Sequence, residues 1–367
     1  AEVIKIEPPQ GDDVRKWGPP FDEEIGAASY FLGVNRNKRG MALDLRMEDG
    51  RAVLMRLLEG ADVLIENFKA GSMEKWGIGF DTLKARFPRL VHCSITGFGN
   101  VGPMAGLPGY DAVIQAQAGL MSVNGVPGGG PTRIGISIVD MCTGMAAAFA
   151  ISMALHDRNA SGLGQHIDTA LYDNAMAILY PHYANYLLSG KIPEIYGNQH
   201  PNLAPYDTYP TKTCAIYVAG GNDGQFAKIC GVLGVPEAAE DPRFKTNSDR
   251  IAHQADLRAL FAPLMAEWDG ETLADALMRA GAPAGPVLNT AEVLAAEQTA
   301  ARNMVVEIDG FRSVGNPIKM SRTPAKPAGR KPPRFGQHTR EILTEAGYDT
   351  TAIEALLRSG AALADPG

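Results

Sequence analysis

The stretch DGRAVLMRLLEGADVLIEN, from Asp49 to Asn67, decides the fold class of this chain. Its first part, up to Ala61, spaces Val, Leu and Met as an amphipathic helix does, and VLIEN is a short apolar run typical of a strand. The pattern then repeats, because a helix-like segment at 80–87 precedes the apolar run LVHCSI at 90–95. Helices that alternate with short apolar strands predict βαβ units and a parallel sheet. The sequence therefore predicts an α/β fold.

Outside this stretch, the chain changes character near Ile192. Before it, AEVIKIE at the start predicts a strand, and two long apolar stretches at 139–157 and 167–188 predict buried helices. After it, Pro, Tyr, Asn and Gly crowd one span without periodicity, which predicts a linker into a second domain. Beyond that linker we expect a strand at CAIYVAG, helices at 225–233, 256–268, 271–280, 339–346 and 351–359, and a Pro- and Lys-rich linker at 323–333.

Composition excludes several classes of protein. A net charge of -7, from 34 basic and 41 acidic residues, argues against a nucleic-acid-binding surface. We expect no membrane-spanning segment, and the start AEVIKIEPP lacks the features of a signal peptide, so we expect a cytoplasmic protein. No CxxC spacing or ligand-spaced His cluster occurs, so we expect no disulfide framework and no metal site, and the cysteines are interpreted as small core residues: Cys93, Cys142, Cys214 and Cys230.

Sequence signals of chemistry are sparse. The chain has no GxGxxG after a strand, no Walker A sequence, no GxSxG and no HExxH, so a dehydrogenase or a kinase loses support. The glycine cluster GVPGGG at 125–130 lacks the flanking strand and helix of a phosphate-binding loop. We interpret it as a flexible loop, or alternatively as a mobile lid over an active site.

The most informative residue is Asp140, in the segment GISIVDMCTGMAAAFAISMAL at 135–155. It precedes a strongly apolar helix, where an Asp can act as an N-cap that contributes about 1 kcal/mol. A carboxylate at a helix start with apolar surroundings is also an available nucleophile for acyl transfer. The sequence leaves both interpretations open, and the two are compatible.

A series of segments, taken together, resembles one known family, the family III CoA transferases, also called the CaiB–BaiF group. From residue 3 to about residue 175 they occur in the family's order and spacing, and weaker matches, GNQHPNLAPY, DPRF and GAPAGPV, extend the resemblance over nearly the whole chain. The stronger segments are VIKIEPPQGDDVR, FLGVNRNKRGMALDL, ADVLIENFKAGSMEKWGIGFDTL, LVHCSITGFGNVGP, GYDAVIQAQAGLM, the Asp140 segment and SGLGQHIDTALYDNA. The family's opening strand and helix, which contribute contacts to CoA, are missing here, so we interpret the chain as truncated or as given without its first segment.

The resemblance implies roles for individual residues. It assigns to Asp140 the role of nucleophile. Attack on the donor thioester gives a mixed anhydride and free CoA thiolate, and return of the thiolate gives an aspartyl–CoA thioester, in which Asp140 carries CoA. Residues that match the family's CoA contacts are Leu43, Asp44, Leu45, Arg46, Asn67, Phe68, Lys69 and Lys75. Lys69 and Lys75 are interpreted as phosphate partners or as solvated lysines, and the cluster Arg36, Lys38 and Arg39 as phosphate partners or as a solvated or packing loop. The segment expected near the pantetheine arm is Gly109, Tyr110 and Asp111.

Tyr110 separates two reactions that this fold supports. Racemases of the same fold place a His before the equivalent of Asp111 and use it as an acid/base group, and this chain has Tyr there. Because the ordinary pKa of tyrosine is about 10, it is a poor base for an α-proton. We therefore favour a transferase over an acyl-CoA racemase or isomerase. The second alternative, a CoA-binding protein without catalysis, is disfavoured by the presence of Asp140.

The family's architecture gives the expected organisation. It is a large Rossmann-like α/β domain plus a smaller α+β domain, joined by two long linkers, in an interlocked dimer of ring-shaped subunits. On this chain we place the large domain at 1–190, a linker at 191–222, the small domain at 215–305, and a return linker with terminal helices at 306–367. We expect a homodimer.

The expected substrates are an acyl-CoA and a carboxylic acid, with no permanently bound cofactor. A GN-x-HP…PY segment like the one here occurs in family members that use succinyl-CoA and small dicarboxylates, so we favour these substrates. Within that segment, His200 and Tyr206 are interpreted as part of the acceptor pocket or as packing of the linker.

Overall fold

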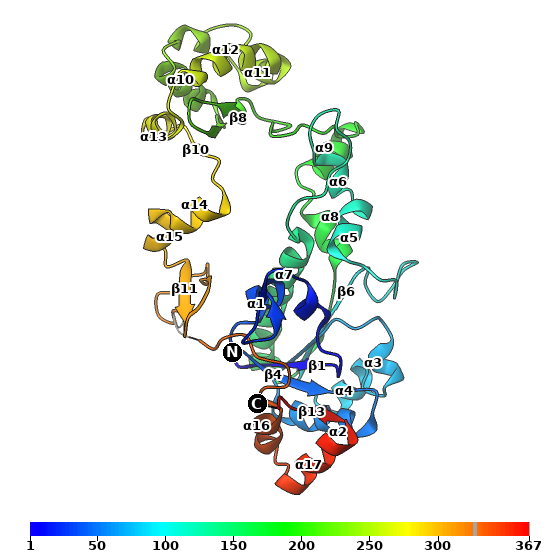
Figure 1. Ribbon diagram of the computed structural model, residues 1–367. Coiled ribbons are helices and arrows are strands. Elements are labelled where there is room, and N and C mark those ends of the chain that lie inside the picture. Colours follow the sequence, from blue (N-terminus) through cyan, green and yellow to red (C-terminus); the bar gives the residue numbers. More distant parts are fainter. Residues whose placement is uncertain (326–328, 367) are drawn as a thin grey trace. The chain divides into compact units, whose positions relative to one another are not determined.

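The structure is a computed structural model that describes residues 1–325 and 329–366 (Figure 1). The chain forms two compact units, which are described separately. The first comprises Ala1–Pro108, Thr143–Leu171 and the chain from Ala291 onward, and the second comprises Gly109–Cys142 and Tyr172–Thr290. These units differ from the predicted domains, because residues 109–142 and 172–190 group with the chain up to Thr290. Whether the domains predicted from the sequence fold on their own stays a prediction.

The first unit contains two three-stranded sheets. In one, β1 (Val3–Glu7) runs parallel to β4 (Lys38–Leu43), and β13 (Ala362–Leu363) pairs antiparallel with β4. In the other, all neighbours are parallel: β5 (Val63–Glu66), β6 (Val91–Thr96) and β7 (His166–Ala170). The predicted strands at the chain start, at VLIEN and at LVHCSI are confirmed, and VLIEN and LVHCSI pair in parallel as predicted. The strand at the chain start instead pairs with β4 in the other sheet.

Helices cover these sheets and bury the apolar residues that the sequence spaces along them. Gly50 lets its helix approach the end of β4, because a Cβ there would lie 2.1 Å from the Asp44 carbonyl oxygen. Helix α16 (Thr339–Glu345) packs on β4 from some 300 residues further along the chain (Figure 1). The other helices of this unit are α1 (Ser29–Asn35), α2 (Glu48–Leu57), α3 (Ser72–Lys75), α4 (Phe80–Arg86), α15 (Glu297–Ala301) and α17 (Thr350–Ser359).

The first unit also contains two short antiparallel pairs, β2 (Phe21–Asp22) with β3 (Ala27–Ala28), and β11 (Val305–Ile308) with β12 (Phe311–Val314). Helix α14 (Thr290–Ala295) begins at the last residue of the second unit. The predicted helices at 49–61, 80–87, 339–346 and 351–359 are confirmed. Of the predicted linker at 323–333, residues 326–328 lie outside the described residues.

Helix α7 (Ile138–Ser161) confirms the first predicted apolar helix. The predicted burial of this helix is wrong for the single chain, because apolar side chains such as Met145 and Phe149 are exposed. The second prediction, one helix from Ile167 to Leu188, is wrong. Its start belongs to β7, whose residues pair in register with β6, for example Ile167 with Cys93. Its remainder forms two helices, α8 (Leu171–Ala177) and α9 (His182–Ser189), separated at Pro181, which has no backbone N–H for a helix interior.

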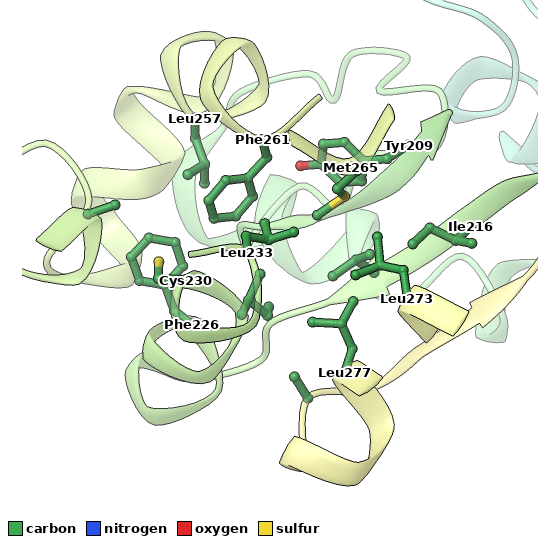
Figure 2. Close-up of a cluster of buried hydrophobic side chains, with 14 of the residues drawn as sticks. Tyr209, Ile216, Phe226, Cys230, Leu233, Leu257, Phe261, Met265, Leu273 and Leu277 are labelled. Atoms are coloured by element: carbon green, nitrogen blue, oxygen red, sulfur yellow. The ribbon is translucent and has the colours of Figure 1, made fainter. Parts of the chain in front are cut away.

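The second unit closes an apolar core of its own between Ala204 and Ala282 (Figure 2). An antiparallel sheet of β8 (Tyr206–Pro210), β9 (Ala215–Ala219) and β10 (Ala284–Pro286) contributes one side of it. The predicted strand CAIYVAG and the three predicted helices of this region are confirmed. The helices here are α10 (Asp223–Val232), α11 (Asn247–Ala252), α12 (Gln254–Ala266) and α13 (Gly270–Ala280), and earlier in the chain α5 (Asp111–Gln117) and α6 (Leu120–Val123).

Candidate active site

The first turn of α7 is capped by a side chain from another helix. Asp111, the first residue of α5, is buried, and its Oδ2 accepts the backbone N–H groups of Val139 at 2.8 Å and Asp140 at 3.2 Å. These N–H groups have no partner inside the helix, so a carboxylate there satisfies them and interacts favourably with the helix dipole. The N-cap interpretation of Asp140 is therefore wrong, since Asp140 is the third residue of α7 and is itself capped by Asp111.

The Asp140 carboxylate lies exposed on the surface of the single chain. Among the residues that the structure describes, none donates a hydrogen bond to it. Partial burial raises the pKa of Asp140 above its ordinary value, and the negative charge of Asp111 raises it further. A carboxylate with a raised pKa and both oxygens free is a better nucleophile than one held in hydrogen bonds.

Two further residues of the predicted pantetheine segment lie directly before α5. Tyr110 is the N-cap residue of α5 in extended conformation, and its side chain is 65% exposed. Gly109 precedes it and is half-buried. The structure thus brings Gly109, Tyr110 and Asp111 into the same unit as Asp140, and it makes Asp111 a buried cap.

The predicted CoA-binding loop follows β5 in the first unit. Asn67, Phe68 and Lys69 are exposed, and the carboxylate of Glu66 accepts the N–H of Phe68 at 2.8 Å. The Phe68 ring packs edge-on against Trp76 at 5.2 Å between centroids. Lys69 and Lys75 are exposed and form no ion pair with the described residues. Both ammonium groups are therefore available to an anionic ligand.

The segment Leu43–Arg46 lies at the end of β4. Leu43 and Asp44 are buried, Leu45 is half-buried, and the Arg46 side chain is 70% exposed. Arg46 binds Asp44 through two of its nitrogens, at 2.8 and 2.6 Å, and this contact holds the pKa of Asp44 below its usual range. The charge of Arg46 is thus already paired within the chain.

The basic cluster after α1 divides into one structural arginine and two other residues. Arg39 is buried and contacts three carboxylates, those of Glu2, Glu341 and Glu345. It is therefore a packing residue, as the alternative interpretation had it. Lys38 donates to the Asn35 side chain at 3.0 Å, and burial lowers its pKa, as does the charge of Lys5. Arg36 is half-buried, and only Arg36 and Lys38 of this cluster remain as candidates.

The structure adds residues that the sequence analysis missed. Gln115, fully buried, donates to Asp111 Oδ1 at 2.6 Å, and the spacing of four residues on one helix was a visible signal for this pair. In the first unit, Glu66 faces His92 at 3.7 Å, and Ser94 contacts His166 at 2.9 Å. Those contacts join strands that are far apart in sequence, so no local pattern pointed to them.

Other predicted features lie in the second unit. His200 and Tyr206 contact each other, with ring centroids 5.0 Å apart, and burial lowers the pKa of His200. The cluster at 125–130 is a loop whose base is closed by Asn124, which donates to the Thr132 carbonyl at 2.8 Å. Its role as a lid and the absence of a metal requirement stay predictions, although no group of three or more His, Cys, Asp or Glu that could hold a metal occurs within the described ranges.

Helix α7 differs from expectation in its hydropathy. The helix has 24 residues and contains an 18-residue window with a mean hydropathy of 1.8, so it is long and apolar enough to cross a bilayer, although no other helix in the described part of the chain is. The sequence predicted no such segment, because no run approaches the roughly 20 apolar residues that span a bilayer. One helix of this kind is weak evidence for a membrane protein, because core helices of water-soluble proteins can have the same length and composition.

Comparisons with known proteins agree with the resemblance. A sequence model of CoA-transferase family III matches residues 1–339. The chain is 40% identical to the succinate–glutarate CoA-transferase of Agrobacterium fabrum, covering 94% of this chain and 88% of that relative. It is 39% identical to the acetyl-CoA:oxalate CoA-transferase of Acetobacter aceti, covering 88% of this chain and 82% of the relative.

A solved structure gives the same result for the fold. The crystal structure of a CAIB/BAIF family protein from Brucella suis superposes with a TM-score of 0.83 at 43% identity, covering 94% of this chain and 92% of that one. The α/β fold with sheets and helices is therefore that of the CaiB–BaiF structures. Together with the family match, this shows that the chain belongs to family III of the CoA transferases and is a CoA transferase.

Proposed function

We propose that the protein moves CoA from an acyl-CoA donor to a carboxylate acceptor through covalent intermediates on Asp140. An oxygen of Asp140 attacks the thioester carbonyl, the C–S bond breaks, and CoA leaves as the thiolate. The thiolate attacks the aspartyl carbonyl of the anhydride, which releases the donor acid and leaves an aspartyl–CoA thioester. The acceptor carboxylate repeats both steps in reverse. Because a thioester and an anhydride are both high-energy acyl forms, each step nearly conserves free energy while water is excluded. No proton or electron is consumed.

The environment of Asp140 carries this proposal. Its carboxylate is exposed and accepts no hydrogen bond from the described residues, while Asp111 satisfies the N–H groups of the first turn of α7. The negative charge of Asp111 and partial burial both raise the pKa of Asp140. A more basic carboxylate is a stronger nucleophile.

The CoA contacts and the acids are part of the same proposal. Lys69 and Lys75, exposed and without ion pairs among the described residues, suit the phosphates of CoA. We propose small dicarboxylates as substrates, since relatives at 40% and 39% identity are named for succinate, glutarate and oxalate. A screen of acyl-CoA donors against carboxylate acceptors, followed by mass spectrometry, tests this choice. Transfer only between monocarboxylic acids would refute it.

We further propose that the protein is a homodimer. Three apolar side chains spaced four residues apart on α7 are exposed: Met145 at 62%, Phe149 at 69% and Met153 at 53%. We call this set the α7 stripe. An exposed apolar stripe on one helix face is a feature of protein interfaces, and a second copy of this chain covers it most economically. The interlocked arrangement and the cytoplasmic location remain predictions.

The decisive experiment replaces Asp140. Asp140→Asn keeps the size of the side chain but removes the nucleophilic carboxylate, so kcat for CoA exchange should fall by about a thousandfold or more. CoA binding, measured by calorimetry, should survive. Wild-type protein incubated with acyl-CoA alone should carry an adduct on the peptide that contains Asp140, which hydroxylamine intercepts. The matched control is Asp157→Asn, an exposed carboxylate on the same helix, which should retain activity.

The same assays separate the alternatives. Near wild-type exchange in Asp140→Asn, with no adduct on its peptide, would refute the proposed role of Asp140. Loss of an α-proton label from an acyl-CoA without exchange would indicate a racemase or isomerase. Binding of CoA with neither reaction would indicate a binding protein.

A further inference from the structure

Two buried side chains of α5 link this helix to the start of α7. Asp111 is 7% exposed and Gln115, one turn further on, is fully buried. The amide nitrogen of Gln115 donates to Asp111 Oδ1 at 2.6 Å. Its amide oxygen accepts the backbone N–H of Ile134 at 2.9 Å. We call Asp111 and Gln115 together the clamp.

The clamp holds both the first turn of α7 and the segment that leads into it. The second oxygen of Asp111 accepts the N–H groups of Val139 and Asp140, and the Gln115 nitrogen also lies 3.4 Å from the Ile136 carbonyl. The donor and acceptor roles in this network are fixed. The Asp111 carboxylate can only accept, and the Gln115 amide donates through its nitrogen and accepts through its oxygen. All of these groups belong to the second unit.

We propose that Gln115 is a positioning residue for the Asp140 nucleophile and acts through Asp111. This inference rests on the proposed role of Asp140. Without the Gln115 amide, Asp111 Oδ1 and the Ile134 N–H lose their partners in a buried place, where unpaired polar groups are costly. The carboxylate then shifts, and the first turn of α7 shifts with it.

Such a shift should act on the rate of reaction more than on binding. Asp140 must meet the thioester carbonyl at one distance and angle, and a displacement of about 1 Å can cost about a hundredfold in rate. CoA binding depends on other residues in this proposal, such as Lys69 and Lys75, which lie in the first unit. A clamp that positions the nucleophile therefore predicts a lower kcat with an unchanged KM.

The first test is Gln115→Leu in the full chain, which keeps the approximate size and removes the amide. We expect kcat per active site to fall by about a hundredfold, with KM for acyl-CoA within about twofold of wild type. Active sites are counted by the stoichiometry of the adduct formed with acyl-CoA alone, so inactive or unfolded protein does not enter kcat. The control is Gln117→Leu, an exposed glutamine on the same helix, which should behave as wild type.

The second test exchanges the two functional groups. Gln115→Glu places two carboxylates face to face, and Asp111→Asn turns an NH₂ group toward the Gln115 amide, so each single variant should lose kcat. In the double variant, the amide now at position 111 can donate to the carboxylate now at position 115 and still accept from α7. That carboxylate in turn accepts the N–H of Ile134. We expect the double variant to recover kcat to within about tenfold of wild type, which separates it from additive losses.

The outcomes distinguish the clamp from the proposed function. If the wild-type adduct does not lie on Asp140, the proposed function itself fails. If it does, but Gln115→Leu keeps wild-type kcat per active site, the clamp is only structural. Should Gln115→Leu fail to fold, the exchange decides alone, and a double variant no better than the product of its single variants overturns the positioning role.

Discussion

The core of the second unit and the helix α7 are both rich in apolar side chains. The core buries its apolar side chains, whereas α7 leaves several of them exposed in the single chain. In the core, Phe226, Phe261 and Leu277 are at most 1% exposed, and the rings of Phe226 and Phe261 lie 5.9 Å apart (Figure 2). On α7, the stripe of Met145, Phe149 and Met153 is more than half exposed in the single chain. Similar composition thus serves two purposes.

The candidate functional residues lie on the side of this contrast where apolar side chains are exposed. The self-contained core holds none of the predicted site residues, so its packing serves stability. Helix α7 carries Asp140 at its start and the exposed stripe further along. Assembly and chemistry therefore depend on one helix in the proposed function. The following variants test whether the two regions separate in this way.

Phe261→Ala should have the largest effect on stability. Removing a fully buried aromatic ring from the core should lower the free energy of unfolding by about 3–5 kcal/mol, through lost burial and a cavity. Urea denaturation followed by circular dichroism measures it, with Met278→Ala, a 56% exposed side chain in the same unit, as control. A loss as small as that of the control would mean that the core repacks freely.

Phe149→Glu should act on assembly instead. A charge in the middle of the α7 stripe should raise the dissociation constant of the homodimer by about a hundredfold, or about 3 kcal/mol, because a buried interface charge lacks a partner. Sedimentation at several concentrations measures it, and Met278→Glu, at an exposed apolar site in the other unit, is the control. If Phe149→Glu dimerises as tightly as wild type, the stripe is not the interface.

The sequence predicted features set by local spacing and missed those set by distant contacts. Apolar spacing located α2, β5 and β6, because each pattern is complete within its own segment. The strand at His166–Ala170 was mistaken for a helix, since its partner β6 lies some 70 residues earlier. Likewise, Arg39 was considered a candidate phosphate ligand. Its glutamate partners Glu341 and Glu345 lie about 300 residues away, so no local pattern pointed to them.

The site shows the same division. Asp140 was found from a motif and the start of an apolar helix, both visible in one segment. Its cap was not found, because Asp111 reaches the Val139 N–H across 28 residues of chain and an intervening loop. Only the spacing of Asp111 and Gln115 on one helix gave a local signal. The spacing alone does not predict a role for the pair, because it does not reveal the bond from the Ile134 N–H to Gln115.

The smallest expected effect is a loss of stability at low pH. It distinguishes the buried histidine pair of the first unit from the apolar core of the second unit. His92 on β6 and His166 on β7 lie opposite each other in register, with ring centroids 5.0 Å apart, and Phe80 stacks on His166 at 4.7 Å. Burial lowers the pKa of His166, and the charge of His92 lowers it further, against the opposing effect of Asp168. In the apolar core, by contrast, burial raises the pKa of Cys230 to about 11, so this thiol stays neutral near pH 7.

The protonation of His166 determines how the free energy of unfolding changes with pH. Because the pKa of His166 is lower in the folded chain than its unfolded value of about 6.5, the unfolded chain binds this proton first as the pH falls. The free energy of unfolding contributed by this site is therefore constant above that value and decreases below it, until the folded state is protonated too. His166→Gln, which can still bond to Ser94, should lose less stability than wild type between pH 7.5 and 5.5, measured by urea denaturation. His156→Gln, an exposed histidine on α7, should lose as much as wild type, and an equal loss in both variants would place the acid sensitivity outside this histidine pair.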